Sequence, residues 1–211
     1  MVDSLCERER DMQCLVSIMA RLRAPDGCPW DREQTHGSIR ANLIEETYEA
    51  LEAIDAGNDA LMCEELGDVL LQVVFHAQMA AERGAFDIND VVRGLCTKLI
   101  ERHAHVFGDV RAENSADALA SWETQKNAAK PGQTARDRLR AVPAALPALM
   151  RADKLMGRAE KAGWVSGDDA PDGGAGRRLW DAAAKVRAEG VNPELALREY
   201  CDRFVDDFTP K

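Results

Sequence analysis

Two pairs of carboxylates are the residues of this sequence best suited to chemistry. The first pair is Glu46 and Glu49, and the second is Glu65 and Asp68. The members of each pair are three residues apart, so on a helix they project from one face. Fifteen residues separate Glu49 from Glu65, which is enough for the chain to end one helix, turn and return antiparallel. The spacing therefore allows both pairs to contribute to one site.

Each pair borders an apolar stripe of its helix. The first stripe contains Ile39, Leu43, Ala50 and Ile54, and the second contains Leu66, Val69, Leu70, Val73 and Ala77. Carboxylates at the edge of a buried stripe are costly unless they are paired or bind a metal ion. Four oxygen ligands from two helices suit a hard cation such as Mg²⁺, which binds at about 2.1 Å. We therefore predict a Mg²⁺ site, although one such pair alone is usually a solvated helix face.

Neighbouring polar residues divide into those that share the acidic face and those that do not. Gln72 and His76 continue the face of Glu65 and Asp68 along the same helix. Glu45 and Glu64 point roughly 100° away from Glu46 and Glu65, so we expect them in solvent or behind the ligands.

A basic face follows on the next expected helix. Lys98, Arg102 and His105 recur at four- and three-residue steps, and Trp122 and Lys126 are again four residues apart. A cationic face beside a metal site suits a polyphosphate, because the metal takes some phosphate oxygens while Lys and Arg take others. The alternatives are an ordinary exposed basic face for Lys98 and Arg102 and a core anchor for Trp122.

Helices are the elements that must position these residues. Apolar residues recur at helical spacing, Gly and Pro mark the breaks, and strand-like alternation is absent. The expected class is all-α. We expect helices over residues 5–22, 38–56, 59–83, 87–106, 115–129, 146–162, 177–189 and 193–208.

Composition excludes several classes of protein. The 211 residues are 45% hydrophobic, which is enough for a core, and the net charge is −10. An acidic chain binds duplex nucleic acid and anionic membranes poorly, so no nucleic acid polymer and no membrane is expected as a partner. The N-terminus lacks a signal-peptide pattern, and the longest apolar stretch, 69–81, is too short to span a bilayer. The six cysteines form no CxxC pair, and we expect a cytoplasmic protein with free thiols.

Seven segments in this order resemble the MazG family of nucleoside triphosphate pyrophosphohydrolases, within the all-α NTP pyrophosphatase superfamily. The resemblance covers about residues 10–165, and the ordered set is far more specific than any one motif. The segments are Leu22-Arg23, Gly27-Cys28-Pro29-Trp30-Asp31, Gln34-Thr35-His36, the cluster from Glu45 to Glu49, Glu65-Leu66-Gly67-Asp68, Gln72-Val73-Val74-Phe75-His76-Ala77 and Arg102-His103-Ala104-His105-Val106-Phe107.

The resemblance implies a four-helix-type bundle that works as a homodimer. The implied reaction is Mg²⁺-dependent hydrolysis of an NTP to NMP and diphosphate, with Mn²⁺ as an alternative ion, as house-cleaning of the nucleotide pool. The resemblance implies that Glu46, Glu49, Glu65 and Asp68 bind the metal ion, and Glu45 or Glu49 is a candidate general base. It also implies that Lys98, Arg102, Trp122 and Lys126 contact the nucleotide. One departure is Leu61, which stands where catalytic members carry a Lys.

The resemblance also suggests a shortened second copy at the C-terminus. Aligning Cys96 with Cys201 sets Lys98 against Arg203 and Arg102 against Asp207. This region contains no second pair of acidic motifs. We therefore expect a catalytic helical domain over 1–130, a connector and helix over 131–162, and a degenerate second-copy segment over 163–211. The alternative is an unrelated helical hairpin over 177–208.

Other functions remain open at this point. A non-catalytic, nucleotide-sensing dimer is favoured only by Leu61. A di-iron carboxylate bundle would need two Glu-x-x-His motifs on inward helix faces, and the sequence offers one, Glu33-Gln34-Thr35-His36. A dUTP or phosphoribosyl-ATP pyrophosphatase would use the same metal site, but the Cys28–Asp31 loop and the Arg102–Phe107 block argue for a MazG protein instead.

Overall fold

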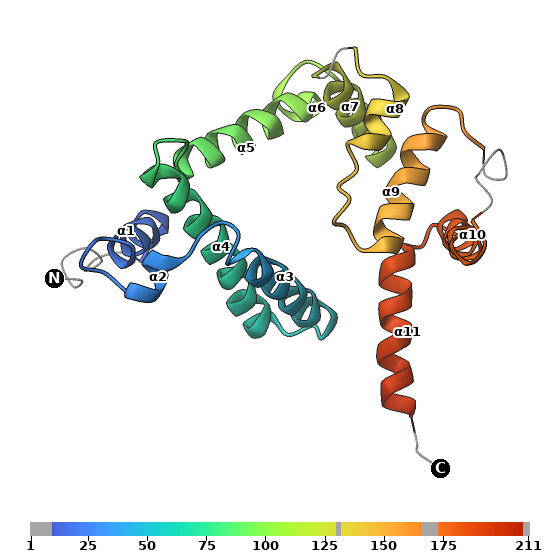
Figure 1. The fold of residues 1–211 in the computed structure, drawn as a ribbon. Coiled ribbons are helices and arrows are strands. Elements are labelled where there is room, and N and C mark those ends of the chain that lie inside the picture. The colour runs from blue at the N-terminus through green and yellow to red at the C-terminus, as the bar shows by residue number, and fades with distance from the viewer. Residues whose placement is uncertain (1–9, 130–131, 166–172, 209–211) are drawn as a thin grey trace. The chain divides into compact units, whose positions relative to one another are not determined.

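The computed structural model describes residues 10–129, 132–165 and 173–208, and every regular element within these ranges is a helix (Figure 1). The all-α prediction is confirmed. The chain divides into two compact units, Met1–Gln125 and Lys126–Lys211. No helix in the described part of the chain is both long enough and apolar enough to cross a membrane.

The first unit is built around one long antiparallel helix pair. Side chains of Asp11, Asn58 and Asp87 cap the starts of α1, α4 and α5, as the short polar side chains at helix N-termini predict. The helices of this unit are α1 (Met12–Leu22), α2 (Pro29–Glu33), α3 (Arg40–Asp55), α4 (Asp59–Glu82), α5 (Ile88–Arg102), α6 (Ala104–Phe107) and α7 (Ser115–Ala128), of which the last continues past the boundary.

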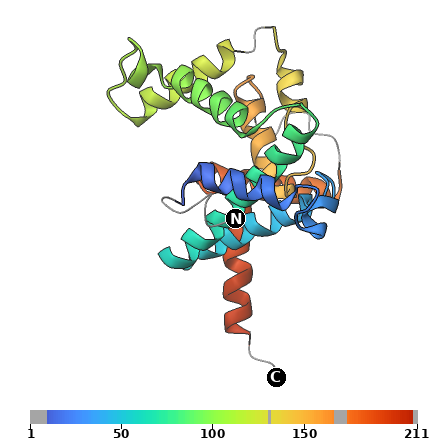
Figure 2. The same ribbon diagram turned by 90° about the vertical axis from the view of Figure 1, so that its left-hand side faces the viewer.

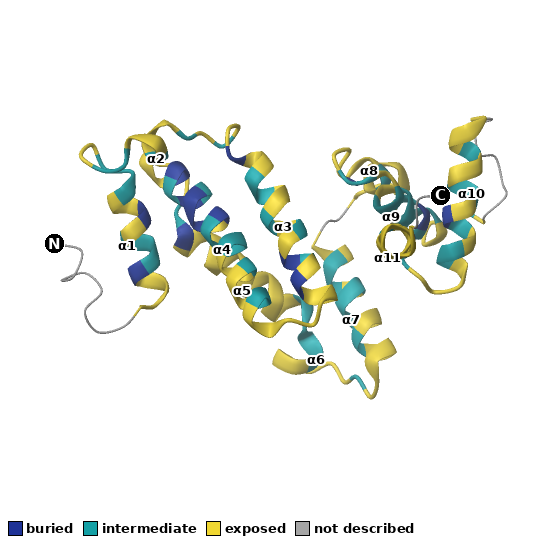
Figure 3. Cartoon of the chain, turned by 90° about the horizontal axis from the view of Figure 1, so that it is seen from below, coloured by how far each residue is buried: buried dark blue, intermediate teal, exposed yellow. Residues whose placement is uncertain are grey.

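The core of the first unit lies where α1, α3 and α4 meet. Small side chains at Ala50 and Ala53 are buried on α3, which lets the two long helices approach closely. The buried positions of α4 gather along one stretch of the helix (Figure 3). The core cluster consists of Met19, Ile39, Val74, Phe75, Ala77, Met79 and Ile88.

Arg23 connects the end of α1 to three other parts of the first unit. Its guanidinium donates to both carboxylate oxygens of Glu82 on α4, at 2.7 and 2.8 Å. It also donates to the backbone carbonyls of Asp31 in α2 and Gln34 in the following turn. The group lies 5.5 Å from the ring centroid of Phe75, and its side chain is 8% exposed. One cation therefore ties the loop before α3 to α4.

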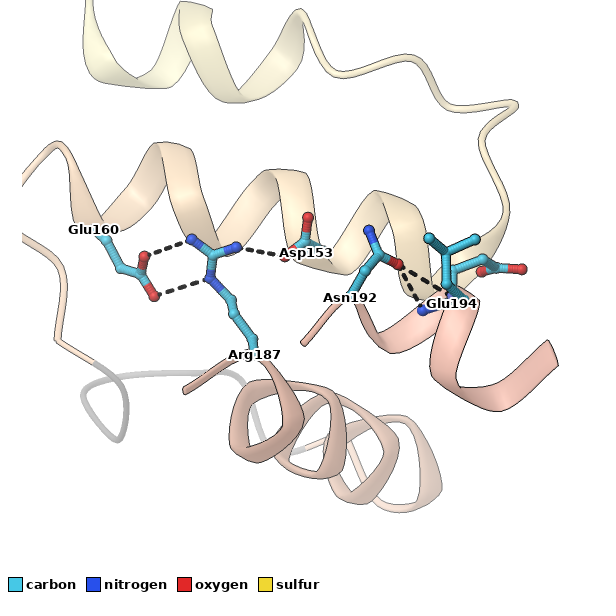
Figure 4. A network of polar contacts seen from close by, with 6 residues as sticks. Asp153, Glu160, Arg187, Asn192 and Glu194 are labelled. Atoms are coloured by element: carbon cyan, nitrogen blue, oxygen red, sulfur yellow. Dashed lines mark hydrogen bonds and ion pairs between the residues drawn. The ribbon is translucent and has the colours of Figure 1, made fainter. Parts of the chain in front are cut away.

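The second unit contains α8 (Ala135–Arg140), α9 (Ala148–Glu160), α10 (Ala175–Ala188) and α11 (Pro193–Asp207). Arg187 of α10 joins it to α9 through ion pairs with Asp153 and with Glu160, the latter at 2.9 Å (Figure 4). α11 packs on α9 and α10 near its start and then leaves the rest of the unit (Figures 1 and 2).

The turns that precede α5 and α11 share one hydrogen-bonding pattern. Gly84 and Gly190 both have positive φ, at 68° and 79°, which glycine adopts without strain. The next residue of each turn donates from its backbone N–H to the carbonyl five residues back, Ala85 to Ala80 and Val191 to Val186. The same pattern follows Gly57 and Gly163, so it is a common way for helices of this chain to end and does not test the hypothesis of a second copy.

Several local expectations were wrong. The short helices α2 and α8 lie in segments expected to be loops, and the expected helix over 87–106 bends at His103 into α5 and α6. Leu66 and Val73 are 50% and 37% exposed, whereas Gln72 is buried. Residues 5–9 of the first expected helix lie outside the described residues. Four cysteines carry free thiols, Cys28, Cys63, Cys96 and Cys201, but Cys14 is disulfide-bonded.

We expect Arg23→Ala to destabilise the first unit by about 2 kcal/mol, after allowing for the partial solvation of Glu82. Arg21→Ala is the matched control, because Arg21 on the same helix forms an exposed ion pair with Asp26 and its loss should cost less than about 0.5 kcal/mol. Urea denaturation followed by circular dichroism measures both. Equal losses would show that the contacts of Arg23 contribute no more than a surface ion pair.

Candidate metal and nucleotide site

Three of the four predicted metal ligands converge in the structure. Glu46 and Glu49 lie in the middle of α3, and Glu65 lies in the first half of the antiparallel α4. One carboxylate oxygen from each of the three lies within 4.8 Å of the others. Glu46 and Glu65 are half-buried and Glu49 is exposed, so the cluster opens to solvent on one side.

Mutual repulsion marks the cluster electrostatically. The pKa of Glu46 is raised by partial burial and then by the charges of Asp68, Glu49 and Glu45. The pKa of Glu65 is raised by desolvation and then by Glu49, Asp68, Glu64 and Glu52. Asp68 lies outside the group of three, yet its charge acts on Glu46 and Glu65 alike. All four predicted ligands are therefore close enough to interact electrostatically.

The donor set fits a hard divalent cation. All donors are carboxylate oxygens, and two oxygens on opposite sides of a Mg²⁺ ion are separated by about 4.2 Å, a separation that the 4.8 Å limit of this group allows. Like charges held together gain from a cation placed among them. The ion pairs described in the first unit join Arg21 to Asp26, Arg23 to Glu82 and Arg93 to Asp90.

The remaining acidic residues surround the cluster. Glu45 and Glu64 are exposed, as expected, and contribute charge to Glu46 and Glu65. Glu52 was not predicted, although it acts on Glu65 in the same way. The signal for it was present, because Glu52 follows Glu49 by the same three-residue step that relates Glu49 to Glu46.

Two of the predicted nucleotide contacts, Lys98 and Arg102, lie on a helix that leads away from the carboxylates of the same chain. About 21 Å of helix separates Asp68 from the end of α4, and α5 then leads away from the α3–α4 pair (Figure 1). Lys98 is exposed in the second half of α5. Arg102, at its last position, lies 5.3 Å from the ring centroid of Trp122, and Lys126 is half-buried near the end of α7.

The bend at His103 changes the expected geometry of the two histidines beside Arg102. An unbroken helix would direct His103 and His105 apart, but their ring centroids are 5.7 Å apart. His103 caps the end of α5, because its Nδ1 lies 2.7 Å from the carbonyl oxygen of Leu99. Nδ1 of His105 is buried without a hydrogen-bond partner among the described residues.

Two further positions bear on nucleotide binding. Leu61 lies in the first turn of α4, one turn before Glu65, where its backbone N–H donates to the Asn58 cap. Its side chain offers no charge toward a phosphate. Trp30 in α2 is 59% exposed, so its ring is free of the core and accessible for stacking.

We expect Glu46→Gln to raise the melting temperature of the metal-free protein at pH 7. A raised carboxyl pKa means that the folded state binds a proton more readily than the unfolded state, so repulsion is relieved as the pH falls through the raised pKa. The advantage of the variant over wild type should shrink on acidification, because the raised pKa lets the wild-type carboxyl take up its proton sooner than an ordinary glutamate does. Thermal melts at pH 7 and pH 4.5 measure the difference, and an advantage that grows on acidification would contradict the assignment.

Comparison with known proteins places these residues in one family. The model of the MazG nucleotide pyrophosphohydrolase domain matches residues 34–107, which include the acidic cluster, Lys98 and Arg102. A Thermotoga maritima protein named nucleoside triphosphate pyrophosphohydrolase/pyrophosphatase MazG is 43% identical over 92% of this chain and 82% of its own length.

Longer relatives match over a smaller part of their own length. The nucleoside triphosphate pyrophosphohydrolase of Escherichia coli is 48% identical over 71% of this chain and 57% of the relative. The Mycobacterium tuberculosis protein of that name is 42% identical over 70% of this chain and 44% of the relative. Because the Thermotoga protein matches nearly all of this chain, and the MazG domain spans the acidic helices α3 and α4, the chain belongs to the MazG family.

Proposed function

We propose that this protein hydrolyses a nucleoside triphosphate to the monophosphate and diphosphate at a Mg²⁺ site formed by Glu46, Glu49, Glu65 and Asp68. The observation that carries the proposal is the convergence of carboxylates from α3 and α4 in a member of the MazG family. The substrate is an NTP of the cytoplasmic nucleotide pool, and Mn²⁺ can replace Mg²⁺.

The carboxylates have two tasks in this reaction. Glu46, Glu49, Glu65 and Asp68 would hold the ion, which supplies positive charge for phosphate oxygens and lowers the pKa of a water molecule. Glu49, exposed at the open side of the cluster, or the neighbouring Glu45 would accept the proton that leaves the attacking water. The phosphoanhydride bond between the α and β phosphorus atoms breaks, and diphosphate leaves.

The site becomes complete in a homodimer. Lys98 and Arg102 are carried away from the acidic cluster of their own chain by the length of α4 and the direction of α5, so a second copy is the natural source of the cations. In a two-fold dimer each chain would give its α5 to the other, which creates two equivalent sites. Arg102, already oriented by the Trp122 ring, would bind a phosphate oxygen of the nucleotide.

An apolar surface on the first unit supports this dimer. It lies on α5, and α4 exposes two further apolar side chains, Leu66 and Val73. Large apolar side chains gathered on one helix are typical of a surface that a partner covers. Those of α5 are Val91, Val92, Leu95, Leu99 and Ile100. Burial of this surface between two copies would hold α5 of one chain near α4 of the other.

We expect Glu49→Gln and Asp68→Asn each to lower diphosphate release by roughly 100-fold or more, since even residues that only orient a metal ligand cost 10–100-fold. The helical circular dichroism spectrum should not change. Glu101→Gln is the control, because Glu101 is an exposed carboxylate on α5. Near wild-type turnover of either site variant in Mg²⁺ would refute the metal assignment.

We expect Arg102→Ala to weaken NTP binding roughly 10- to 100-fold, the range of one charge-assisted hydrogen bond, with little effect on NMP binding. Arg93→Ala is the matched control, because Arg93 lies on the same helix and pairs locally with Asp90. Isothermal titration measures both ligands. Equal losses for NTP and NMP would indicate a structural role for Arg102.

The two-chain site has a separate test by complementation. Mixing Glu49→Gln and Arg102→Ala chains, with unfolding and refolding to exchange subunits, should restore about a quarter of wild-type activity, because half the dimers then contain one complete site. The assay uses NTP below the KM of the Arg102 variant. No recovery in a mixture shown to form heterodimers would place the cations and the carboxylates of one site on the same chain.

A further inference from the structure

Two histidines form a contact outside the acidic cluster that the reaction does not use. His36 lies in the turn between α2 and α3, and His76 lies on α4. Their Nδ1 atoms are 2.8 Å apart, their ring centroids are 5.1 Å apart and their planes differ by 4°. The centroid separation exceeds the nitrogen separation by two ring radii, so both Nδ1 atoms lie on the line between the centroids. The rings therefore meet edge to edge in one plane.

This geometry is that of a single N–H···N hydrogen bond. The Nδ1 bonding directions lie in the ring planes and point at each other, so one nitrogen donates and the other accepts. A metal ion between two such nitrogens would separate them by about 4 Å, so the pair is not a metal site. If both Nδ1 atoms carried a hydrogen, the two N–H groups would point at each other and their repulsion would break the contact.

Burial assigns the proton to His36. Nε2 of His36 is buried without a partner among the described residues, and a buried N–H left unpaired is costlier than an unpaired lone pair. His36 therefore carries its hydrogen on Nδ1 and leaves Nε2 bare, while His76 accepts at Nδ1. The pKa of His76 is lowered by burial and by the proximity of His36, which keeps the acceptor neutral near pH 7.

The segment around His36 transmits this bond to α3. Backbone N–H groups of Thr35 and Ser38 donate to each other's side-chain oxygens at 2.9 and 3.1 Å, and the Ser38 hydroxyl donates to Gln34 at 2.8 Å. Ile39, which follows at once and caps α3, is 2% exposed. His36 is thus rigidly joined to the start of α3, rather than lying on a free loop.

The histidine pair and the carboxylate cluster are two contacts between the same two antiparallel segments of the chain, at nearly equal separations along each. Glu46 comes ten residues after His36, and Glu65 comes eleven residues before His76. A slide of α3 along α4 would break the histidine bond and change the separation of the carboxylates together. Repulsion within the acidic cluster favours separation of the helices, and the histidine bond opposes it at the other end of the pair.

We infer that His36 and His76 are a positioning pair whose one hydrogen bond sets the register of α3 against α4, and with it the spacing of the carboxylates that bind the metal. The inference rests on the proposed function only for the identity of that site. The charged groups nearest the pair in sequence, on the elements that carry or flank it, are Asp31, Arg32 and Glu33 of α2, Arg40 of α3, Asp68 and Glu82 of α4, and Arg23, which follows α1. The remaining charges of α3 and α4 include the carboxylates of the acidic cluster. Arg23 and Glu82 neutralise each other.

The test compares His76→Asn with His76→Gln in the full-length chain. Asn places its amide oxygen where Nδ1 of His76 lies and can accept from His36, whereas Gln places its amide one atom farther, at the position of Nε2. Both are neutral and polar, so they differ mainly in the location of the acceptor. If Gln at position 76 prevents folding, His36→Asn and His36→Gln give the same contrast from the donor side.

Two measurements do not need substrate. Hydrogen exchange of the backbone amides of residues 43–46 in the metal-free protein should accelerate in the Gln variant and stay near wild type in the Asn variant. Affinity for Mn²⁺, measured by electron paramagnetic resonance without nucleotide, should fall about 10- to 100-fold in the Gln variant and only a few-fold in the Asn variant. Equal behaviour of the two variants in both measurements would overturn the inference.

Nitrogen-15 spectra of the histidines in the wild-type, metal-free protein add an independent check. His36 should show the Nδ1–H tautomer and His76 the Nε2–H tautomer, and identical tautomers would overturn the proton assignment. Should wild type bind no Mn²⁺ while the exchange contrast persists, the proposed metal site fails and the positioning of α3 by the histidines stands.

Discussion

Carboxylates of like charge, held together by two helices, are the constraint on which the first unit depends. The pKa values of Glu46 and Glu65 are raised first by desolvation and then by the charges of the neighbouring carboxylates. Only packing elsewhere can oppose that repulsion in the absence of a cation. The small buried side chains of Ala50 and Ala53 permit close helix contact, and the Arg23 and His36 contacts hold the segment that enters α3.

Arg23 illustrates how one residue can support a site that it does not touch. Its guanidinium donates hydrogen bonds to Glu82 and to two backbone carbonyls, which fixes the start of the loop from α2 to α3. The histidine bond fixes the same loop on its other side. Two polar contacts of different chemistry thus restrain a short segment whose position determines where Glu46 and Glu49 lie.

The described residues of the second unit hold no cluster of carboxylates like that of α3 and α4. The turn into α11 has the hydrogen bonds of the turn into α5, but the ranges described between α9 and α10 contain no counterpart of α3. Like α5, α11 exposes large apolar side chains, among them Leu195, Tyr200 and Phe204. Exposed apolar side chains without such a cluster suit association rather than catalysis.

The sequence by itself determined the helical class, most helix positions and the residues of the acidic cluster. These follow from short-range rules, because helical periodicity, capping side chains and the three-residue spacing of Glu46 and Glu49 act within a few turns of one helix. The sequence wrongly predicted that Leu66 and Val73 are buried and that Gln72 is not. Helical periodicity groups residues on faces, but it does not say which face of an apolar helix packs against the rest of its own chain.

Only the tertiary structure decided what lies opposite each helix. The bend at His103 depends on a local cap that competes with helix continuation, and helical periodicity carries no signal for it. The His36–His76 contact joins residues forty positions apart, and the sequence showed them only as a polar residue on a face and a histidine near a loop. Their meeting requires that α3 and α4 pack antiparallel, and that arrangement arises from contacts across the helix pair rather than from any property of one helix alone.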